Sequence, residues 1–357
     1  MKLTIVAGAR PNFMKVAPIL WEIARRPGVV AHLVHTGQHY DEKMSKLFFD
    51  QLRIPKPDVD LEVGSGSHAV QTAEVMKRFE PVVLSQKPDA VVVVGDVNST
   101  IACAITAVKL GIPVAHVEAG LRSFDRTMPE EINRLLTDSI SQWLFVSEQS
   151  GVENLRNEGT DPSRVHFVGN VMIDTLIACR DQFEAAVDLG QFGIRSGEYA
   201  VLTLHRPANV DDPNAFSGLL RAVQSIQRNL PIIFPVHPRT RKALADQSLD
   251  LPNVKLVEPL GYLEFMKLVA HARFVLTDSG GIQEETTYLG VPCLTLRTNT
   301  ERPSTIHQGT NVLVGLDPDR IVAAAEVAAR RDRPPAKVPD LWDGMASARI
   351  LDVLQAR

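Results

Sequence analysis

The 357-residue chain has few cysteines, few aromatic residues and no long apolar segment. Its three cysteines, Cys103, Cys179 and Cys293, lie far apart, so they suggest neither a disulfide framework nor a metal site. No apolar run approaches the ~20 residues that cross a bilayer, and the apolar start, Lys2 to Ala7, has only the length of a strand. We therefore expect a cytoplasmic protein with reduced thiols, no secretory signal and no membrane partner.

The chain also lacks an excess of charge of one sign. A net charge of -4 gives no electrostatic reason to expect nucleic acid or an anionic membrane as a partner. The apolar fraction of 45% and the charged fraction of 22% are typical of a globular protein. The length is great for a single core and suits two domains.

Short runs rich in Val and Ile alternate with helical patterns along the whole chain. Most runs are apolar on both faces, which favours buried parallel strands joined by helices, and hence a doubly wound α/β fold. The predicted strands are 3–7, 29–35, 90–94, 114–117, 144–146, 165–167, 200–204, 232–236, 254–256, 274–277, 293–296 and 312–314. Predicted helices include 13–24, 68–84, 102–110 and 215–228.

A domain boundary is predicted near residues 170–197, where a helix over 170–183 is followed by a glycine-containing loop. We expect an N-terminal domain of residues 1–170 and a C-terminal domain of residues 171–340. A last helix over 341–356 follows a proline-rich break and is expected to complete the first domain. Two facing parallel sheets would leave a cleft at the carboxyl ends of their strands, where ligands bind in such folds.

The stretch Thr277-Asp278-Ser279-Gly280-Gly281-Ile282-Gln283-Glu284-Glu285 joins a predicted buried strand to a segment of helical character. A turn of small residues at this junction presents free backbone N–H groups and the positive end of a helix dipole, which favours phosphate. The acidic pair one turn later is placed to reach a ribose diol. The stretch therefore predicts a site for a nucleoside diphosphate.

Charged residues follow the predicted strands of the first half. Arg10 and Lys15 follow the first strand, Asp96 follows the strand 90–94, and Glu118 directly continues the strand 114–117. Structural explanations exist for each: solvated charges for Arg10 and Lys15, a helix N-cap for Asp96, and a salt bridge with Arg122 for Glu118.

The segment Pro129-Glu130-Glu131 begins a predicted helix, where the helix dipole by itself favours acidic residues. It nevertheless brings another carboxylate to the same sheet edge. Carboxylates beside Arg10, Arg122 and Arg134 are more typical of an acid–base site than of a solvated face.

In the second half, His205 and His237 follow two predicted strands at equivalent positions, which favours a functional role over a structural one. Arg302 follows another strand and offers a phosphate-binding guanidinium. Phe265 opens a helix and is a candidate to stack on a base, although the core is the commoner place for a Phe.

In this order the segments resemble the non-hydrolysing UDP-N-acetylglucosamine 2-epimerases, over residues 3–356. The matching segments are Gly8-Ala9-Arg10-Pro11, His35-Thr36-Gly37-Gln38-His39, Gly95-Asp96-Val97-Asn98-Ser99-Thr100, Val117-Glu118-Ala119-Gly120-Leu121-Arg122, Pro129-Glu130-Glu131-Ile132-Asn133-Arg134, His205-Arg206-Pro207, Asp278-Ser279-Gly280-Gly281-Ile282-Gln283-Glu284-Glu285 and Thr300-Glu301-Arg302-Pro303. The resemblance implies the GT-B fold, two Rossmann-like domains with the active site in the cleft between them.

The resemblance implies four catalytic groups, which by motif are Asp96, Glu118, Glu130 and His205. It implies nucleotide contacts at Arg10, Phe265, Ser279, Gly280, Gly281 and Glu285, with Arg302 nearby and Lys15 at a further site position. Arg134 and His237 complete the expected substrate-binding set.

The implied reaction is the C2 epimerisation of a UDP-sugar. UDP leaves by anti elimination, 2-acetamidoglucal stays bound, C2 is reprotonated on the other face, and UDP adds back. The reaction needs an acid, a base and stabilisation of the diphosphate, but no cofactor and no metal. A homodimer is the family's usual state.

Two features depart from the pattern of many bacterial members. Of the glutamine pair that contacts a regulatory UDP-N-acetylglucosamine, Gln38 is present but Asp41 takes the second position. The histidine motif is His205-Arg206-Pro207-Ala208-Asn209, without paired arginines. The stretches Gly8–Phe13 and His35–Tyr40 are also similar to those of relatives that act on UDP-2,3-diacetamido-uronic acids, so an epimerase of such a sugar is an alternative. Further alternatives are a hydrolysing 2-epimerase, a GT-B glycosyltransferase and a non-catalytic nucleotide-sugar sensor.

Overall fold

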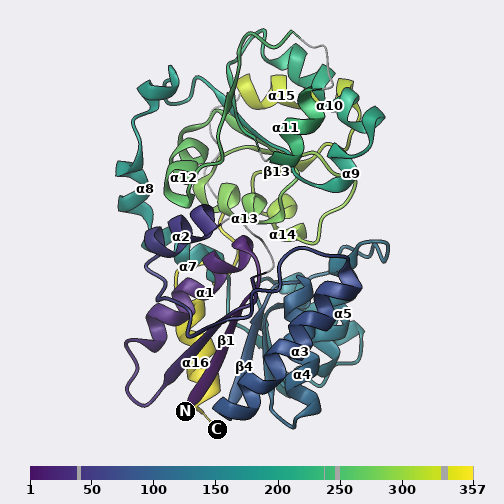
Figure 1. Ribbon diagram of the computed structural model, residues 1–357. Helices are drawn as coiled ribbons and strands as arrows, with labels where there is room; N and C mark the ends of the chain where they lie inside the picture. The colour runs from purple at the N-terminus through teal and green to yellow at the C-terminus, as the bar shows by residue number, and fades with distance from the viewer. Residues whose placement is uncertain (38–41, 237, 246–249, 331–336, 357) are drawn as a thin grey trace. The chain divides into compact units, whose positions relative to one another are not determined.

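The computed structural model describes residues 1–37, 42–236, 238–245, 250–330 and 337–356 (Figure 1). The chain divides into two compact units, Met1–Ala178 with Asp340–Arg357, and Cys179–Pro339. Each unit contains one parallel sheet with helices between its strands. None of the helices described is both long and apolar enough to cross a membrane.

The first unit contains a seven-stranded sheet of order β3-β2-β1-β4-β5-β6-β7, in which every pair is parallel. Its strands are β1 Lys2–Ala7, β2 Val30–His35, β3 Val59–Asp60, β4 Ala90–Val94, β5 Val114–Ala119, β6 Trp143–Val146 and β7 Val165–Phe167. Its helices are α1 Arg10–Ile23, α2 Glu42–Gln51, α3 His68–Gln86, α4 Asn98–Lys109, α5 Pro129–Ile140, α6 Gln149–Asn157, α7 Val171–Ala178 and α16 Ala346–Gln355. Helices α3, α4 and α5 pack in one layer, and α1, α7 and α16 pack in another (Figure 1).

The second unit contains a six-stranded parallel sheet of order β10-β9-β8-β11-β12-β13. Its strands are β8 Ala200–Thr203, β9 Ile232–Pro235, β10 Val254–Val257, β11 Phe274–Thr277, β12 Cys293–Thr295 and β13 Asn311–Leu313. Its helices are α8 Arg180–Ala186, α9 Pro207–Val210, α10 Pro213–Ile226, α11 Pro238–Ala245, α12 Tyr262–His271, α13 Gly280–Leu289, α14 Pro303–His307 and α15 Pro318–Arg330.

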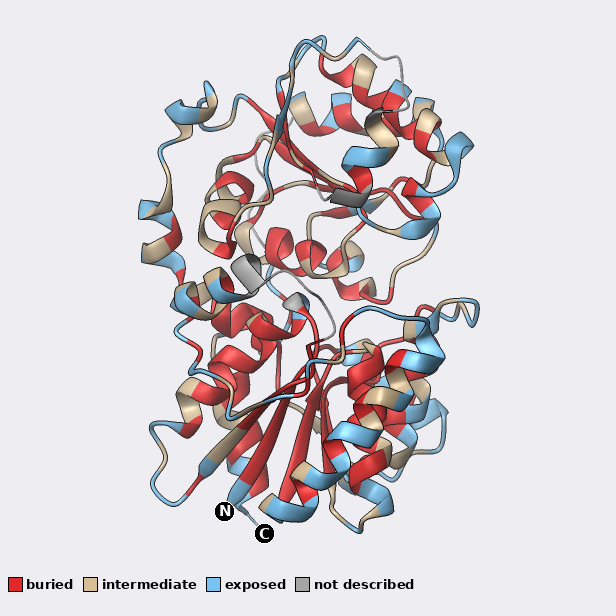
Figure 2. Ribbon diagram, viewed as in Figure 1, coloured by how far each residue is buried: buried red, intermediate tan, exposed pale blue. Residues whose placement is uncertain are grey.

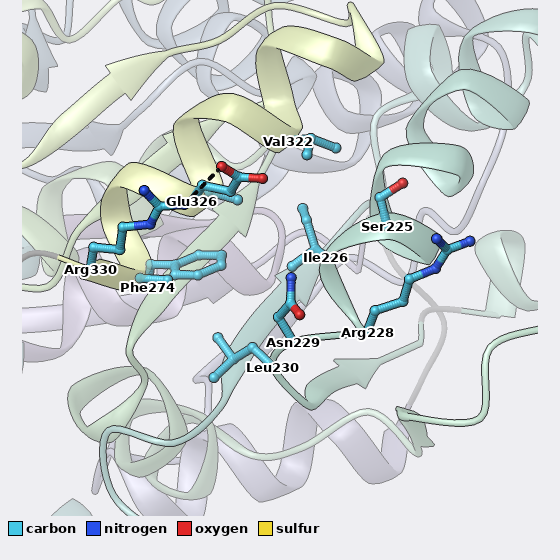
Figure 3. A pocket seen from close by; sticks show the side chains of 11 residues that line it. Ser225, Ile226, Arg228, Asn229, Leu230, Phe274, Val322, Glu326 and Arg330 are labelled. Carbon is cyan, nitrogen blue, oxygen red and sulfur yellow. Dashed lines mark hydrogen bonds and ion pairs between the residues drawn. The ribbon is translucent and has the colours of Figure 1, made fainter.

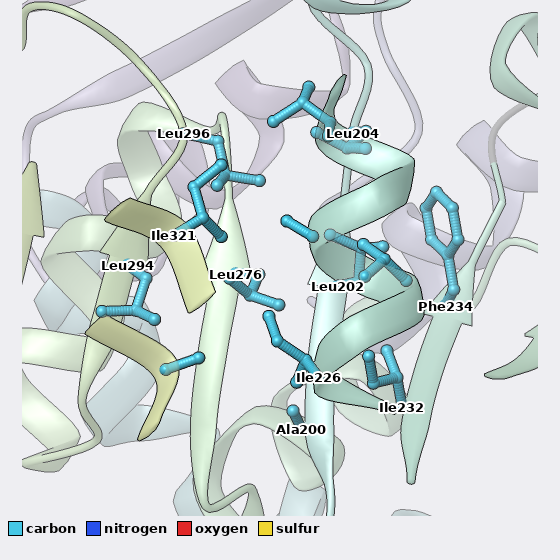
Figure 4. Close-up of a cluster of buried hydrophobic side chains, with 14 of the residues drawn as sticks. Ala200, Leu202, Leu204, Ile226, Ile232, Phe234, Leu276, Leu294, Leu296 and Ile321 are labelled. Atoms are coloured by element: carbon cyan, nitrogen blue, oxygen red, sulfur yellow. The ribbon is translucent and has the colours of Figure 1, made fainter. Parts of the chain in front are cut away.

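The central strands are buried on both faces, as the apolar runs predict. Every residue of β4 and β5 is buried, and Figure 2 colours the central strands of the first sheet as buried. In the second unit, side chains of β8, β9, β11 and β12 meet those of α10 and α15 in one apolar cluster (Figure 4). Burying each such aliphatic side chain contributes about 1.5–3 kcal/mol, which favours the parallel arrangement over a half-exposed sheet.

The predicted α/β class with two doubly wound parallel sheets is confirmed, and each predicted strand coincides with an observed one to within two residues. The two-residue edge strand β3 was too short to leave an apolar run. The predicted helix over 170–183 is broken into α7 and α8, because Cys179, with φ -93° and ψ 3°, departs from helical geometry between them.

The last helix begins at Ala346 rather than at residue 341. The buried carboxylate of Asp174, on α7, accepts the N–H groups of Ala346 at 3.1 Å and Ser347 at 2.7 Å, and also the Ser347 hydroxyl at 2.7 Å. These bonds satisfy amides that have no partner within the helix, so they define where α16 begins.

In each sheet the strand order runs in opposite directions on the two sides of a point beside the first strand of that unit. In the first unit this switch point lies between β1 and β4, and in the second it lies between β8 and β11. Crossover helices diverge there, which leaves room for a ligand at the carboxyl ends of the strands. The residues that follow β1, β4, β8 and β11 are those that the sequence marks as functional.

Candidate functional site

Glu118 occupies a strained position inside β5. Its φ is +73°, in the left-handed region that non-glycine residues rarely adopt. The pairing of β5 with β6 shifts register between Val117 and Ala119, so Glu118 is the extra residue of a β-bulge. The bulge takes the Glu118 side chain out of the regular alternation of side chains between the two faces of the sheet. Bulges of this kind are common near active sites.

The buried carboxylate of Glu118 pairs with the ammonium group of Lys15, on α1. The predicted alternative, a salt bridge between Glu118 and Arg122, is therefore wrong. A Cβ atom on Gly95 would lie 2.9 Å from Lys15 Nζ and 3.3 Å from Glu118 Oε2. The ion pair thus lies directly beside the turn that carries Asp96.

Asp96 lies in the turn between β4 and α4 and pairs with Arg134, on α5. The neighbouring Asn133 donates its side-chain amide to the carbonyl of Asp96 at 2.9 Å. Helix α4 has Val97 at its N-cap, so the alternative that Asp96 caps this helix is wrong. Its carboxylate is held by the guanidinium of Arg134 at the sheet edge.

The two glutamates at the start of α5 differ in their surroundings. Glu131 is buried and accepts hydrogen bonds from the Ser123 and Phe124 amides, the Ser123 hydroxyl and Arg134. Burial acts to raise the pKa of Glu131, but these donors outweigh it and the pKa is lowered. Glu131 is therefore engaged within the unit, whereas Glu130 is half-buried in the first helical turn.

Arg122 is buried away from these carboxylates. It pairs with Asp138 at 2.7 Å and with Glu158 at 2.8 Å. Asp138 also binds the ring of His116, with 2.6 Å between Oδ1 and Nδ1. Arg122 stabilises the inside of the unit, and the expectation that it joins the acid–base cluster is wrong.

In the second unit, His205 follows β8 and is held by Asp278, which follows β11. The atoms His205 Nδ1 and Asp278 Oδ1 are 2.8 Å apart, and the histidine side chain is 50% exposed. Fully buried Asp278 also accepts the amides of His205 and Arg206 and the side-chain amide of Asn209. Burial acts to raise the pKa of Asp278, but His205 and these donors lower it.

Sequence reasoning missed this role of Asp278. The signal was available, because Asp278 follows a buried strand as Asp96 does. Because Asp278 engages Nδ1, Nε2 is the ring nitrogen of His205 that a ligand would meet.

The N-terminus of α13 is formed by Ser279, Gly280 and Gly281. Ser279 is the N-cap residue, but its side chain makes no capping hydrogen bond. A Cβ atom on Gly280 would lie 2.4 Å from Arg302 Nη1, so glycine is required for this guanidinium to reach the helix end. A guanidinium beside the positive end of a helix forms a cationic corner suited to an anion.

The cationic corner is balanced by buried carboxylates. Arg302 pairs with Glu284 at 3.1 Å and also with Glu301, which binds Arg297 at 2.7 Å. Burial acts to raise the pKa of Glu301, but the arginines hold it well below its usual range. Glu284 and Glu301 thus hold the arginine in place.

Glu285 is buried beside Glu284 but is not engaged in the same way. Its Oε1 atom has no hydrogen-bond partner among the described residues. Burial raises the pKa of Glu285 to about 8, the charge of Glu284 adds to the shift, and the nearby Tyr262 hydroxyl opposes it. A buried oxygen with spare hydrogen-bonding capacity is suited to a hydroxyl of a ligand.

Some predicted residues lie away from these contacts. The side chain of Arg10 and all of His237 lie outside the described residues, as do Gln38 and Asp41. Phe265 is half-buried in the first turn of α12. No three His, Cys, Asp or Glu side chains within the described ranges are placed to hold a metal ion.

A pocket of about 460 Å³ lies at the other end of the second sheet (Figure 3). Its lining includes Phe274, the first residue of β11, Leu230, before β9, and Arg330 at the end of α15. Ligands of doubly wound sheets bind at the carboxyl ends of the strands, so this pocket is not part of the candidate site.

Comparisons with known proteins find relatives over nearly the whole chain. A family model described as UDP-N-acetylglucosamine 2-epimerase matches residues 21–355. The chain is 43% identical to the UDP-N-acetylglucosamine 2-epimerase of Methanocaldococcus jannaschii, covering 93% of each chain. It is 42% identical to the UDP-2,3-diacetamido-2,3-dideoxy-D-glucuronate 2-epimerase of Pseudomonas aeruginosa, covering 99% of each.

The crystal structure of the M. jannaschii enzyme in complex with UDP-GlcNAc and UDP superimposes with a TM-score of 0.93 over 100% of both chains, at 41% identity. Similarity at this level extends over both sheets and the connections that carry the candidate residues. The chain therefore belongs to the UDP-N-acetylglucosamine 2-epimerase family.

Proposed function

We propose that this protein catalyses the reversible C2 epimerisation of UDP-N-acetylglucosamine to UDP-N-acetylmannosamine without net hydrolysis. The observation that carries the proposal is the position of the Glu118–Lys15 pair directly beside the Gly95–Asp96 turn, where Arg134 holds the Asp96 carboxylate. Two carboxylates from different strands supply the acid and base that an epimerisation needs.

In the proposed reaction a base removes the proton from C2 while the C1–O bond breaks. The electron pair of that bond leaves with UDP, and a C1–C2 double bond remains in the sugar. A proton is then delivered to the opposite face of C2, and UDP adds back to C1. Asp96, Glu118 and Glu130 are the proposed proton-transfer groups.

We assign the leaving diphosphate to the second unit. His205, Arg302 and the N-terminus of α13 at Ser279–Gly281 would stabilise the charge that develops on UDP. Arg10, Lys15, Arg134 and His237 are proposed to contact the substrate. Glu285 is proposed to hold the ribose and Phe265 the base.

A second candidate substrate is a UDP-2,3-diacetamido-uronic acid. The M. jannaschii and P. aeruginosa enzymes, whose names give different sugars, are 43% and 42% identical to this chain. The first candidate is tested by incubating the protein with UDP-N-acetylglucosamine in D2O and following the sugar by NMR.

Deuterium at C2 together with UDP-N-acetylmannosamine supports the proposal, whereas free sugar and UDP would indicate a hydrolysing enzyme. The uronate is tested in the same way, and the larger kcat/KM identifies the substrate. Absence of exchange with both sugars would contradict the proposal. We also propose that the protein is a homodimer supplying N-acetylmannosamine-type sugars for surface polysaccharides.

The Asp96→Asn variant tests the proton chemistry. We expect it to lose turnover but to bind UDP with nearly unchanged affinity, measured by calorimetry. Glu153→Gln, at an exposed position of α6, is the matched control and should keep full activity. Loss of UDP binding in Asp96→Asn would mean that Asp96 has a different role.

A further inference from the structure

Phe124, in the connection between β5 and α5, is an exposed aromatic residue with a disfavoured backbone. Its exposed fraction is 77% and its φ is +59°. A bulky residue in the left-handed region is a genuine outlier, because its Cβ crowds the neighbouring carbonyl. The exposed ring gains little packing within the unit to offset this cost. Such residues persist where the surroundings enforce them, and they cluster at functional sites.

The surrounding contacts hold the Phe124 backbone firmly. Its amide donates to Oε1 of Glu131 at 2.9 Å, and the amide and hydroxyl of Ser123 donate to Oε2 at 3.0 Å each. The same Oε2 accepts a hydrogen bond from Arg134 at 2.6 Å, and Arg134 pairs with Asp96. An unbroken chain of polar contacts therefore leads from the backbone of Phe124 to a candidate catalytic carboxylate.

We propose that Phe124 is a substrate-retaining residue whose ring packs on the sugar part of the bound UDP-sugar. This inference rests on the proposed function. After elimination the sugar is a neutral glycal with no covalent link to UDP, so only contacts with the protein keep it in place. An aromatic ring offers a large apolar surface with few rotatable bonds, which suits the C–H face of a pyranose.

The test compares Phe124→Ala, Phe124→Gly and Phe124→Trp with the wild type. We expect the KM for the UDP-sugar to rise about fivefold in the Ala and Gly variants, which lack the ring. The inhibition constant of UDP, which has no sugar, should stay within about twofold. NMR should show free glycal and UDP accumulating in these two variants, and Phe124→Trp should restore retention.

A stability measurement separates function from folding. Glycine tolerates a positive φ, so Phe124→Gly should raise Tm by about 2 °C while it impairs retention. Lys87→Gly is the matched control, because Lys87 is exposed, has a φ of +47° and ends α3 shortly before the amino-terminal end of β4. It should give a similar rise in Tm with unchanged kinetics.

Several outcomes would overturn the inference. Unchanged kinetics in Phe124→Ala and Phe124→Gly would do so, as would a parallel change in the KM of the UDP-sugar and the inhibition constant of UDP. A changed molar mass of these variants in light scattering would assign Phe124 to an interface between copies. A wild-type protein that exchanges C2 hydrogen in neither sugar would overturn the proposed function, and this inference with it.

Discussion

At the scale of single residues, Glu118 shows how the backbone determines what a side chain is free to do. In a regular strand its neighbours would fix the face to which the carboxylate points. The bulge and the φ of +73° release it from this alternation and place it against Lys15. The strained backbone destabilises the folded state, but it holds the Glu118 carboxylate in this position.

The strained backbone of Glu118 predicts that a glycine variant at this position is more stable than an alanine variant. Glu118→Ala and Glu118→Gly both remove the partner of Lys15, so their difference reports the backbone alone. We expect Glu118→Gly to be more stable by about 1 kcal/mol in urea unfolding, because glycine accepts positive φ. At Glu153, within α6, the order should reverse by a similar amount, since glycine disfavours helix. Equal stability of the two Glu118 variants would show that the position is not strained.

Glu285 predicts a dependence of stability on pH. The pKa of Glu285 is raised from 4.5 to about 8, so the folded state keeps a proton that the unfolded state loses between these pH values. Stability is therefore lost as pH rises from about 4.5 to about 8, by up to ~1.4 kcal/mol per unit. Glu285→Gln should match the wild type near pH 5 and exceed it near pH 8.

The control for Glu285 is Glu258→Gln, an exposed glutamate in the same unit. Its stability curve should follow that of the wild type at every pH. A Glu285→Gln protein whose unfolding free energy has the same slope with pH as the wild type would contradict the shifted pKa.

At the scale of elements, the carboxyl end of β11 organises the end of β8. Asp278 accepts the amides of His205 and Arg206, so the residue that follows one strand shapes the connection that follows its neighbour. It also holds the ring of His205, and the side-chain amide of Asn209, on α9, donates to both Asp278 and the carbonyl of Leu296. The His205-Arg206-Pro207-Ala208-Asn209 motif is thus partly structural.

The pairing of Asp278 with His205 predicts non-additive variants. Asp278→Asn and His205→Gln should each lower kcat by about 10²-fold, because both remove an oriented imidazole. The double variant should be no slower than the slower single variant. The control is Asp212→Asn at the N-cap of α10. Asparagine also caps helices, so this variant should leave kcat unchanged. Fully multiplicative losses would show that the two residues act separately.

At the scale of the whole molecule, the end of the chain returns to the first unit. Helix α16 packs on α1 and α7, and Arg26 of the first unit binds Asp352 at 2.6 Å. The indole of Trp342 donates to the carbonyl of Ser147 at 2.8 Å. The first unit is therefore completed by residues that follow the second unit in the sequence.

The anchoring of α16 is tested at Asp174. Asp174→Ala removes the acceptor of two α16 amides and should cost about 2 kcal/mol, or a fall in Tm of about 4–8 °C. Hydrogen exchange should accelerate in α7 and α16 but not in the second unit. The control is Asp161→Ala, because Asp161 is exposed in a turn. This change should lower the free energy of unfolding by less than 1 kcal/mol. Unchanged exchange in α16 would contradict its anchoring by Asp174.

The sequence alone determined the strands, the parallel class and the elements that follow each strand, because apolar runs and turn residues are local properties. It also pointed to Asp96, Glu118 and His205 as functional residues. Only the tertiary structure decided their partners: Lys15 rather than Arg122 for Glu118, Arg134 for Asp96, and Asp278 for His205. The two residues of each pair lie 103, 38 and 73 positions apart in the chain, respectively. Contacts at such separations follow from strand order and from a bulge, which composition and spacing do not encode.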